Sequence, residues 1–169
     1  MDNKTKLVVY IALLAALCAV ATMVIPIPTP TGGYLNAGDI VVVLSALLMG
    51  PIWGGAASGV GSALADILGG YAVYAPGTLI AKGLAALITG LVFRRTKKAI
   101  PAAICGEIAM AAVYFAYEGL ALGFGLGAAV EIPGNLMQGA LGVIGGVAHD
   151  GTAELALRGD VQPVGRLVH

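Results

Sequence analysis

The sequence predicts an all-α integral membrane protein that crosses the bilayer six times and keeps both termini in the cytoplasm. The first reason is composition: 59% of the 169 residues are hydrophobic, 11% are charged, and the mean hydropathy is +0.93. A soluble domain of this size could not bury so much apolar surface. The second reason is that the apolar residues form long runs broken by short Gly- and Pro-containing segments. The third is the placement of the positive charges.

Six apolar runs are the expected spans. They are Leu7–Ile27, Ile40–Met49, Ile52–Leu68, Pro76–Phe93, Ile100–Tyr117 and Ala128–Val147. The second and third are shorter than the roughly 20 residues of a straight span, and only Gly50-Pro51 separates them. They form either two spans or a re-entrant hairpin, and two spans are favoured because the second run can recruit residues from Asn36 onward. We divide the chain into one membrane domain, 1–148, and a polar cytoplasmic tail, 149–169, because Ala148 to Thr152 should end the last helix.

The first run could be either a transmembrane helix or a secretory signal peptide, because Lys4 and Lys6 ahead of an apolar stretch are typical of both. The run continues to about Ile27, which is long enough to span. Leu17 precedes Cys18, where a lipoprotein cleavage site would need a small residue. We therefore expect a retained first helix.

The positive charges orient the spans. With the N-terminus inside, eight of the nine Lys and Arg residues lie in the cytoplasm, and the ninth is Lys82. The expected outer loops, 28–38, 69–75 and 118–127, contain no Lys or Arg. Nine acidic residues balance the nine basic ones, so net charge indicates no nucleic-acid partner.

Small residues repeat along two of the expected helices, and small residues allow close helix packing in lipid. In the first run, Ala12 and Ala16, and Ala15 and Ala19, are each four residues apart. This surface could dock another membrane protein or pack within the chain. In the third run, one small stripe begins at Gly55, and an adjacent, more polar stripe begins at Gly54 and ends at Asp66.

Polar residues in three expected helices reach a similar depth in the outer half of the membrane. Lys82 lies about 9 Å below the outer end of its span, at 1.5 Å per residue. Glu118 ends the next span, with Tyr114 one turn deeper. Glu131, Asn135 and Gln138, spaced four and three apart, share a helical face. These side chains predict a polar pocket, since ionisable groups in a membrane usually serve a function.

Each of these residues also has a structural interpretation. Asn135 and Gln138 could link helices by hydrogen bonds, and Glu131 could mark the interface. Lys82 could contact a ligand or form an ion pair with Glu118.

Three further acidic residues are expected to have structural roles. Asp39 resembles a helix N-cap. Asp66 is expected to hydrogen-bond neighbouring loops, and Glu107 to make a packing or partner contact.

The outer loops complete the expected pocket. The segment 28–34 is stiff at its prolines and pliable at Gly32-Gly33, as in a loop that can close over a ligand. Tyr71 and Tyr74 bring aromatic rings to the same level, although an interfacial belt would explain them equally well. A lid and an aromatic wall over a polar floor would suit a small flat heterocycle.

Several segments together resemble the substrate-binding S component of energy-coupling factor (ECF) vitamin transporters. The resemblance is closest to the hydroxymethylpyrimidine/pyridoxine-type and riboflavin-type members and covers about residues 7–146. It is carried by GYLNAGD at 33–39, LMGP at 48–51, GSALAD at 61–66, YAPGTLIAKG at 74–83, YE at 117–118 and EIPGNLMQ at 131–138.

The resemblance implies a mechanism that composition cannot show. An S component captures a vitamin from outside the cell, docks through its first helix onto a transmembrane T component coupled to two cytoplasmic ATPases, and topples to release the vitamin inside. It implies the plasma membrane of a prokaryote and no catalysis, cofactor or metal in this chain, with ATP used by the partners. The substrate-binding residues are then Asn36, Tyr74, Lys82, Tyr114, Glu118, Glu131, Asn135 and Gln138, and the docking residues are Ala12, Ala15, Ala16 and Ala19. Hydroxymethylpyrimidine or pyridoxine is the favoured vitamin, and riboflavin is next.

Two other classes are the alternatives. A self-contained secondary transporter or channel would use Lys82 and the membrane carboxylates for ion coupling. An intramembrane enzyme would need a nucleophile and a base, but the sequence has neither HExxH nor GxSxG, and Ser58 and Ser62 have no histidine in any expected span.

Overall fold

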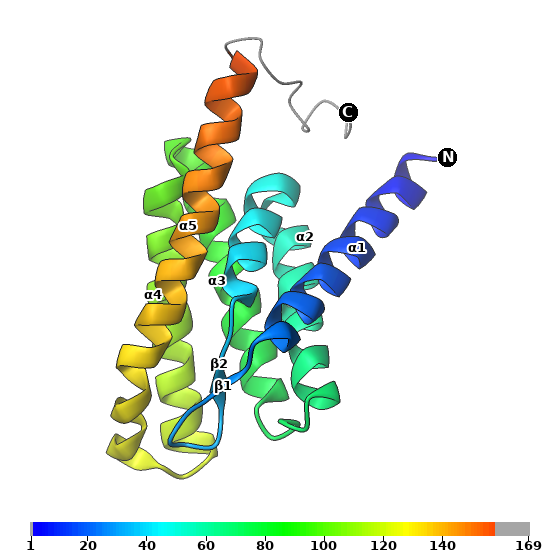
Figure 1. Cartoon of the computed structure of the whole chain (residues 1–169). Helices are drawn as coiled ribbons and strands as arrows, with labels where there is room; N and C mark the ends of the chain where they lie inside the picture. Colours follow the sequence, from blue (N-terminus) through cyan, green and yellow to red (C-terminus); the bar gives the residue numbers. More distant parts are fainter. Residues whose placement is uncertain (1, 158–169) are drawn as a thin grey trace.

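The computed structural model describes residues 2–157, with side chains described through residue 153, and shows a helical bundle with one small hairpin. The elements are α1 (Asn3–Val24), β1 (Ile27–Pro28), β2 (Tyr34–Leu35), α2 (Gly38–Leu68), α3 (Ala75–Thr96), α4 (Ala99–Ala116), a π-helical turn η1 (Tyr117–Ala121), a 3-10 helix η2 (Gly125–Glu131) and α5 (Ile132–Leu157). Each long helix packs against the next in the chain, and α5 also returns to α2. Figure 1 shows α1 on one side of the bundle, with its N-terminal half standing away from the other helices.

Helix α2 consists of two halves that fold back on each other. Gly50 adopts φ 79° and ψ 178°, a conformation open to glycine that ends the first half, and Pro51 starts the second. The halves are antiparallel neighbours, because the Ser58 hydroxyl donates to the Val42 carbonyl (3.5 Å) and Gly54 packs against the backbone of Ala46. The first half is about 18 Å long at 1.5 Å per residue. This length is less than the roughly 30 Å thickness of the hydrocarbon core of a bilayer.

The second half of α2 is the central packing element of the bundle. Three of its glycines face three different neighbours: Gly54 meets the first half of α2, Gly59 meets the backbone of Leu79 on α3, and Gly61 meets the carbonyl of Ala15 on α1. A Cβ at any of these glycines would clash with backbone, so larger residues would push the helices apart. The small stripes of the sequence thus pack inside the chain.

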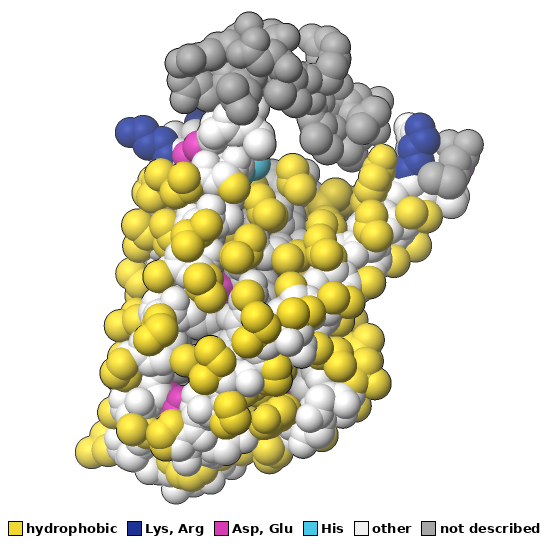
Figure 2. Space-filling model, viewed as in Figure 1, with side chains coloured by type: hydrophobic (Ala, Val, Ile, Leu, Met, Phe, Trp, Pro, Cys, Tyr) yellow, Lys and Arg dark blue, Asp and Glu magenta, His cyan; other side chains and the backbone are white. Residues whose placement is uncertain are grey.

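The surface of the bundle is apolar over most of its length. Figure 2 shows hydrophobic side chains over the visible face, with Lys and Arg at the end where Figure 1 places the N-terminus. Val8, Ile52 and Leu68 are each 64 to 65% exposed, which would be costly in water and is expected in lipid. Among the described residues, α1, α2, α3 and the segment 99–121 are long and apolar enough to cross a membrane. The count of six spans and the orientation of the termini remain predictions.

Three predicted helix boundaries are wrong. The first helix ends at Val24 rather than Ile27, because Pro26 and Pro28 impose extended backbone, and the chain enters β1. The last helix starts later than Ala128, since 125–131 forms a 3-10 helix. It also continues through 148–152 to Leu157, because that segment contains no proline and a single Gly151 is tolerated within a helix. Residues 158–169 of the predicted tail lie outside the described part of the chain.

Candidate functional site

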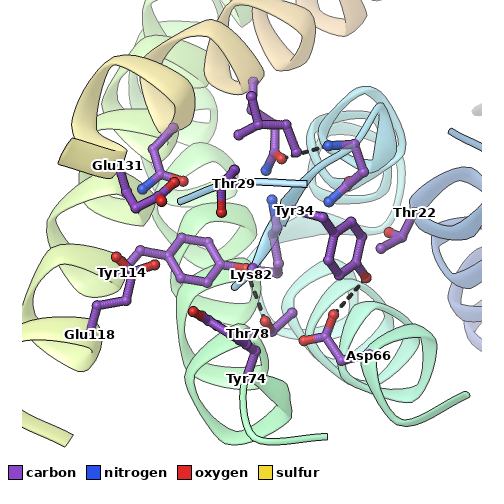
Figure 3. A pocket seen from close by; sticks show the side chains of 15 residues that line it. Thr22, Thr29, Tyr34, Asp66, Tyr74, Thr78, Lys82, Tyr114, Glu118 and Glu131 are labelled. Carbon is purple, nitrogen blue, oxygen red and sulfur yellow. Dashed lines mark hydrogen bonds between the residues drawn. The ribbon is translucent and has the colours of Figure 1, made fainter. Parts of the chain in front are cut away.

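A polar cavity lies where the β1–β2 hairpin meets the second half of α2, α3, α4 and α5 (Figure 3). Its lining residues are Thr22, Thr29, Gly33, Tyr34, Leu35, Asn36, Asp66, Tyr74, Thr78, Lys82, Tyr114, Glu118, Glu131, Asn135 and Gln138. The free volume of the cavity is about 30 Å³, far below the roughly 300 to 1,000 Å³ of typical ligand pockets. Any ring-sized ligand therefore requires the hairpin or side chains to move.

All eight residues predicted to bind substrate line this one cavity. Asn36 comes from the loop after β2, Tyr74 and Lys82 from the start of α3, and Tyr114 from α4. Glu118 lies on η1, Glu131 at the end of η2, and Asn135 and Gln138 on the first two turns of α5. The spacing of the last three residues does place them on one side, even though η2 interrupts the expected helix.

Lys82 forms an ion pair with Asp39 rather than with Glu118, the partner considered as the structural alternative to a ligand. The Lys82 Nζ atom lies 2.5 Å from Asp39 Oδ1, and the two residues are 1% and 0% exposed. Gln138 Nε2 donates to the other Asp39 oxygen (2.7 Å), while Gln138 Oε1 accepts from the backbone N–H of Asn36 (2.8 Å). The ammonium also contacts the Met110 sulfur at 3.0 Å. This network ties α3, α5 and the first turn of α2 together at the cavity floor.

Asp39 is therefore not the helix cap that its position suggested. The residue that precedes α2 is Ala37, and the first N–H of the helix, that of Gly38, donates to Asn36 Oδ1 (2.9 Å). The first residues of α2, Gly38 and Asp39, are buried inside the bundle, where Asp39 meets Lys82. The sequence did contain a signal for the pair, since Asp39 begins an apolar run in the same way that Lys82 interrupts one.

The hairpin is held over the cavity by hydrogen bonds that Thr31 and Tyr34 donate and by one that the loop accepts from Tyr74. The backbone N–H and hydroxyl of Thr31 donate to Glu131 Oε1 at 3.0 and 2.9 Å. The Tyr74 hydroxyl donates to the Thr31 carbonyl (2.7 Å), and the Tyr34 hydroxyl donates to Asp66 Oδ1 (2.6 Å). Burial raises the pKa of Tyr34 and of Tyr74, which keeps both phenols protonated as donors. The loop predicted to close over a ligand is thus held at three points.

Tyr114 presents its ring to the cavity beside Lys82. Its hydroxyl donates to the Thr78 hydroxyl (3.0 Å), which fixes the ring between α3 and α4. The Lys82 ammonium lies 5.6 Å from the ring centroid, within the range of a cation–π contact. In Figure 3 the ring of Tyr114 points across the cavity from the side that also carries Glu118 and Glu131.

Four buried polar atoms of the lining have no hydrogen-bond partner among the described residues. They are Thr22 Oγ1, Glu118 Oε2, Asn135 Nδ2 and Asp66 Oδ2. The four residues are 1%, 4%, 7% and 2% exposed, respectively. Buried polar groups are normally satisfied by protein, water or ligand. These atoms are consequently the groups best able to receive a ligand's donors and acceptors.

Other cavity residues were missed at the level of sequence. Thr22, Thr29 and Thr78 bring hydroxyl groups to the cavity, but single threonines in or beside apolar runs give no pattern. Asp66 does bond to a neighbouring loop as expected, yet it also lines the cavity. Glu107 lies outside the cavity and packs against Gly139 and Gly142 of α5, so its contacts are internal to the chain.

The predicted docking alanines divide into two pairs. Ala12 and Ala16 are exposed, whereas Ala15 lies against Gly61 of α2 and Ala19 is buried. In the most apolar 18-residue stretch of α1, only 17% is buried inside the protein, compared with 44 to 56% in the corresponding stretches of the other three candidate spans. Helix α1 thus leaves a broad apolar face with Ala12 and Ala16 uncovered by the described chain.

The fold and the cavity together define a multi-pass membrane protein with a polar binding chamber beneath a fastened loop. Residues 2–148 match the family model described as "ECF-type riboflavin transporter, S component". A protein of Pyrococcus woesei, described as "Uncharacterized protein in gap 3'region", is 40% identical over 129 residues, which are 74% of this chain and 86% of that protein. The chain belongs to the ECF transporter S component family. S components are non-catalytic substrate-binding subunits that capture vitamins and deliver them to the ECF complex.

Proposed function

We propose that this chain captures a small heterocyclic vitamin or vitamin precursor from outside a prokaryotic cell and passes it to an ATP-driven ECF complex. Hydroxymethylpyrimidine or pyridoxine is the favoured ligand, because the polar cavity has little free volume and would need to open less for one substituted ring than for a larger vitamin. The observation that carries the proposal is the convergence of polar side chains from the β1–β2 hairpin, the adjoining loops, η1, η2 and helices α1 to α5 onto a cavity that retains unpartnered buried atoms.

Riboflavin is the second candidate. The family model that the chain matches is described as a riboflavin transporter component. A flavin has three fused rings and a long hydroxylated chain, so it would require a much larger opening of the 28–37 loop than a single ring would. Binding of a flavin would therefore depend strongly on the bonds that fasten the loop.

A vitamin panel titrated calorimetrically into the purified full chain tests the capture role. One member should bind tightly, and Asn135→Ala should weaken that binding about tenfold, since one hydrogen bond contributes about 1 kcal/mol or somewhat more. Leu136→Ala is the matched control, because Leu136 is the next residue on α5 and is 52% exposed. If no vitamin binds tightly, the capture role is wrong. If the Asn135 variant and the wild type bound the vitamin with equal affinity, Asn135 would have a structural role rather than a role in binding.

Delivery is proposed to use the exposed side of α1, with a T component docking at Ala12 and Ala16 and two ATPases driving release. Small residues permit the close backbone approach that stabilises helix association in lipid. Uptake by reconstituted vesicles should require the T component and the ATPases. Uptake by this chain alone would instead favour the self-contained transporter, in which Lys82 and the carboxylates couple to ions.

A further inference from the structure

The cavity has an excess of acidic groups. Asp66, Glu118 and Glu131 all contribute carboxyl groups to its lining. Lys82 is the one cationic side chain among the described lining residues, and Asp39 already pairs with it at 2.5 Å. A ligand that enters the cavity therefore meets three carboxyl groups, while the described chain offers it no unpaired ammonium or guanidinium group.

The carboxyl groups differ in how far the protein already satisfies them. Glu131 uses one oxygen to hold Thr31, and Asp66 uses one to accept from Tyr34. Glu118 is 4% exposed and accepts no hydrogen bond from any described residue. Figure 3 shows Glu118 on the same side of the cavity as Glu131. Glu118 is thus the strongest free acceptor in the lining.

Asn135 supplies an independent second observation. Its side chain is 7% exposed, lines the same cavity, and has an amide nitrogen without a described partner. An amide N–H donates to an acceptor such as a ring nitrogen, whereas a carboxylate accepts from N–H groups. The two residues together complement a ring that carries an acceptor nitrogen and an amino group.

We propose that the captured vitamin is a nitrogen heterocycle bearing an amino group, neutral or cationic, whose N–H groups donate to Glu118 and whose ring nitrogen accepts from Asn135. This inference rests on the proposed capture function and narrows its substrate class. Carboxylated or phosphorylated relatives are rejected, because their charge is repelled by Glu118, Glu131 and Asp66 in a water-poor cavity. Selection against anions would confine uptake to vitamins that have not been phosphorylated.

Matched ligands test the substrate class. Pyridoxamine, pyridoxine and 4-pyridoxic acid share one ring and differ at one position, which carries an aminomethyl, hydroxymethyl or carboxyl group. A second pair is 4-amino-5-hydroxymethyl-2-methylpyrimidine and its 4-oxo analogue. In calorimetric titrations of the full chain, the amino member of at least one set should bind tenfold or more tighter than its neutral partner. 4-Pyridoxic acid should bind at least a hundredfold more weakly than pyridoxamine or show no binding.

A variant then assigns the preference to a residue. Glu118→Gln replaces one acceptor oxygen with an N–H donor, so the preference for the amino ligand should fall below threefold. Leu120→Ala, a change two residues along η1 at a side chain that is 86% exposed, should leave the preference intact. A preference that persists in Glu118→Gln would overturn the role of Glu118.

The remaining outcomes separate this inference from the capture function. Tight binding of 4-pyridoxic acid, or of riboflavin with neither amino compound bound, would refute the substrate class while leaving capture intact. Failure of every compound in the panel, riboflavin included, would refute capture itself.

Discussion

The pair formed by Lys82 and Asp39 should behave as a single energetic unit in the folded protein. Both side chains are almost completely buried, and their charged atoms lie 2.5 Å apart. Lys82→Met leaves the Asp39 carboxylate buried with Gln138 as its remaining partner. Asp39→Asn leaves the ammonium beside the Met110 sulfur and a neutral amide. Each single change leaves one buried charge without its partner, and this loss lowers the free energy of unfolding by about 3 to 5 kcal/mol.

The double variant should be far less affected than the sum of the single variants. Taking about 3 kcal/mol for each single change, independent effects would add to about 6 kcal/mol. The double variant is neutral and keeps an amide beside Gln138, so we expect it to lose only about 2 kcal/mol. The difference is a coupling energy of about 4 kcal/mol, within the range measured for close charge pairs.

Reversible unfolding of the full chain in mixed micelles, titrated with SDS and followed by far-ultraviolet circular dichroism, would measure these free energies. Leu84→Met is a matched control on α3, because Leu84 is 37% exposed and is not one of the side chains bonded to Lys82 or Asp39. A double variant that loses the full sum of about 6 kcal/mol would refute the pairing. The affinity of a stable double variant for its vitamin would then report whether Lys82 also contacts the ligand.

Three further outcomes test the lid and the docking surface. Tyr34→Phe removes the 2.6 Å bond to Asp66, which should speed vitamin release about tenfold in stopped-flow measurements, because a hydrogen bond to a carboxylate contributes about 1.5 kcal/mol or more; an unchanged rate would mean that this bond does not fasten the loop. Thr31→Val removes the hydroxyl donor to Glu131 but keeps the backbone donor, so release should quicken by a smaller factor, and a larger factor than for Tyr34→Phe would contradict that ranking. Ala16→Leu should leave vitamin affinity unchanged and abolish uptake by the assembled complex, while Ala16→Ser should sustain uptake; normal uptake with leucine would remove Ala16 from the docking surface.

Local chemistry allowed much of the helical pattern to be predicted. The apolar runs, the break at Gly50-Pro51 and the starts of α3 and α4 all follow from hydropathy and from the residues that interrupt helices. The misplaced boundaries occur where alternatives lie close in energy. Prolines at 26 and 28 ended α1 early, and 148–152 contained no feature strong enough to end α5.

The membership of the site was largely predictable, but its internal bonding was not. Placing a polar residue inside a membrane costs free energy, so each polar residue within an apolar run was a candidate for the site. Depth along separate helices then suggested that Lys82, Glu118 and Asn135 would meet, and all three line the cavity. Depth alone cannot choose partners within a layer. It left Glu118 and a ligand as the two candidate partners of Lys82, while the folded chain pairs Lys82 with Asp39.

The sequence by itself determined that this chain resides in lipid, where its helices run, and which side chains were too polar to face lipid. Those properties depend on transfer free energies that each residue carries with it. Only the tertiary structure decided that α2 folds back at Gly50 and brings Asp39 to Lys82, because this contact joins positions 43 residues apart through the packing of small residues. With Lys82 paired to Asp39, Glu118 and Asn135 are among the lining residues that keep a buried polar atom without a partner in the described chain.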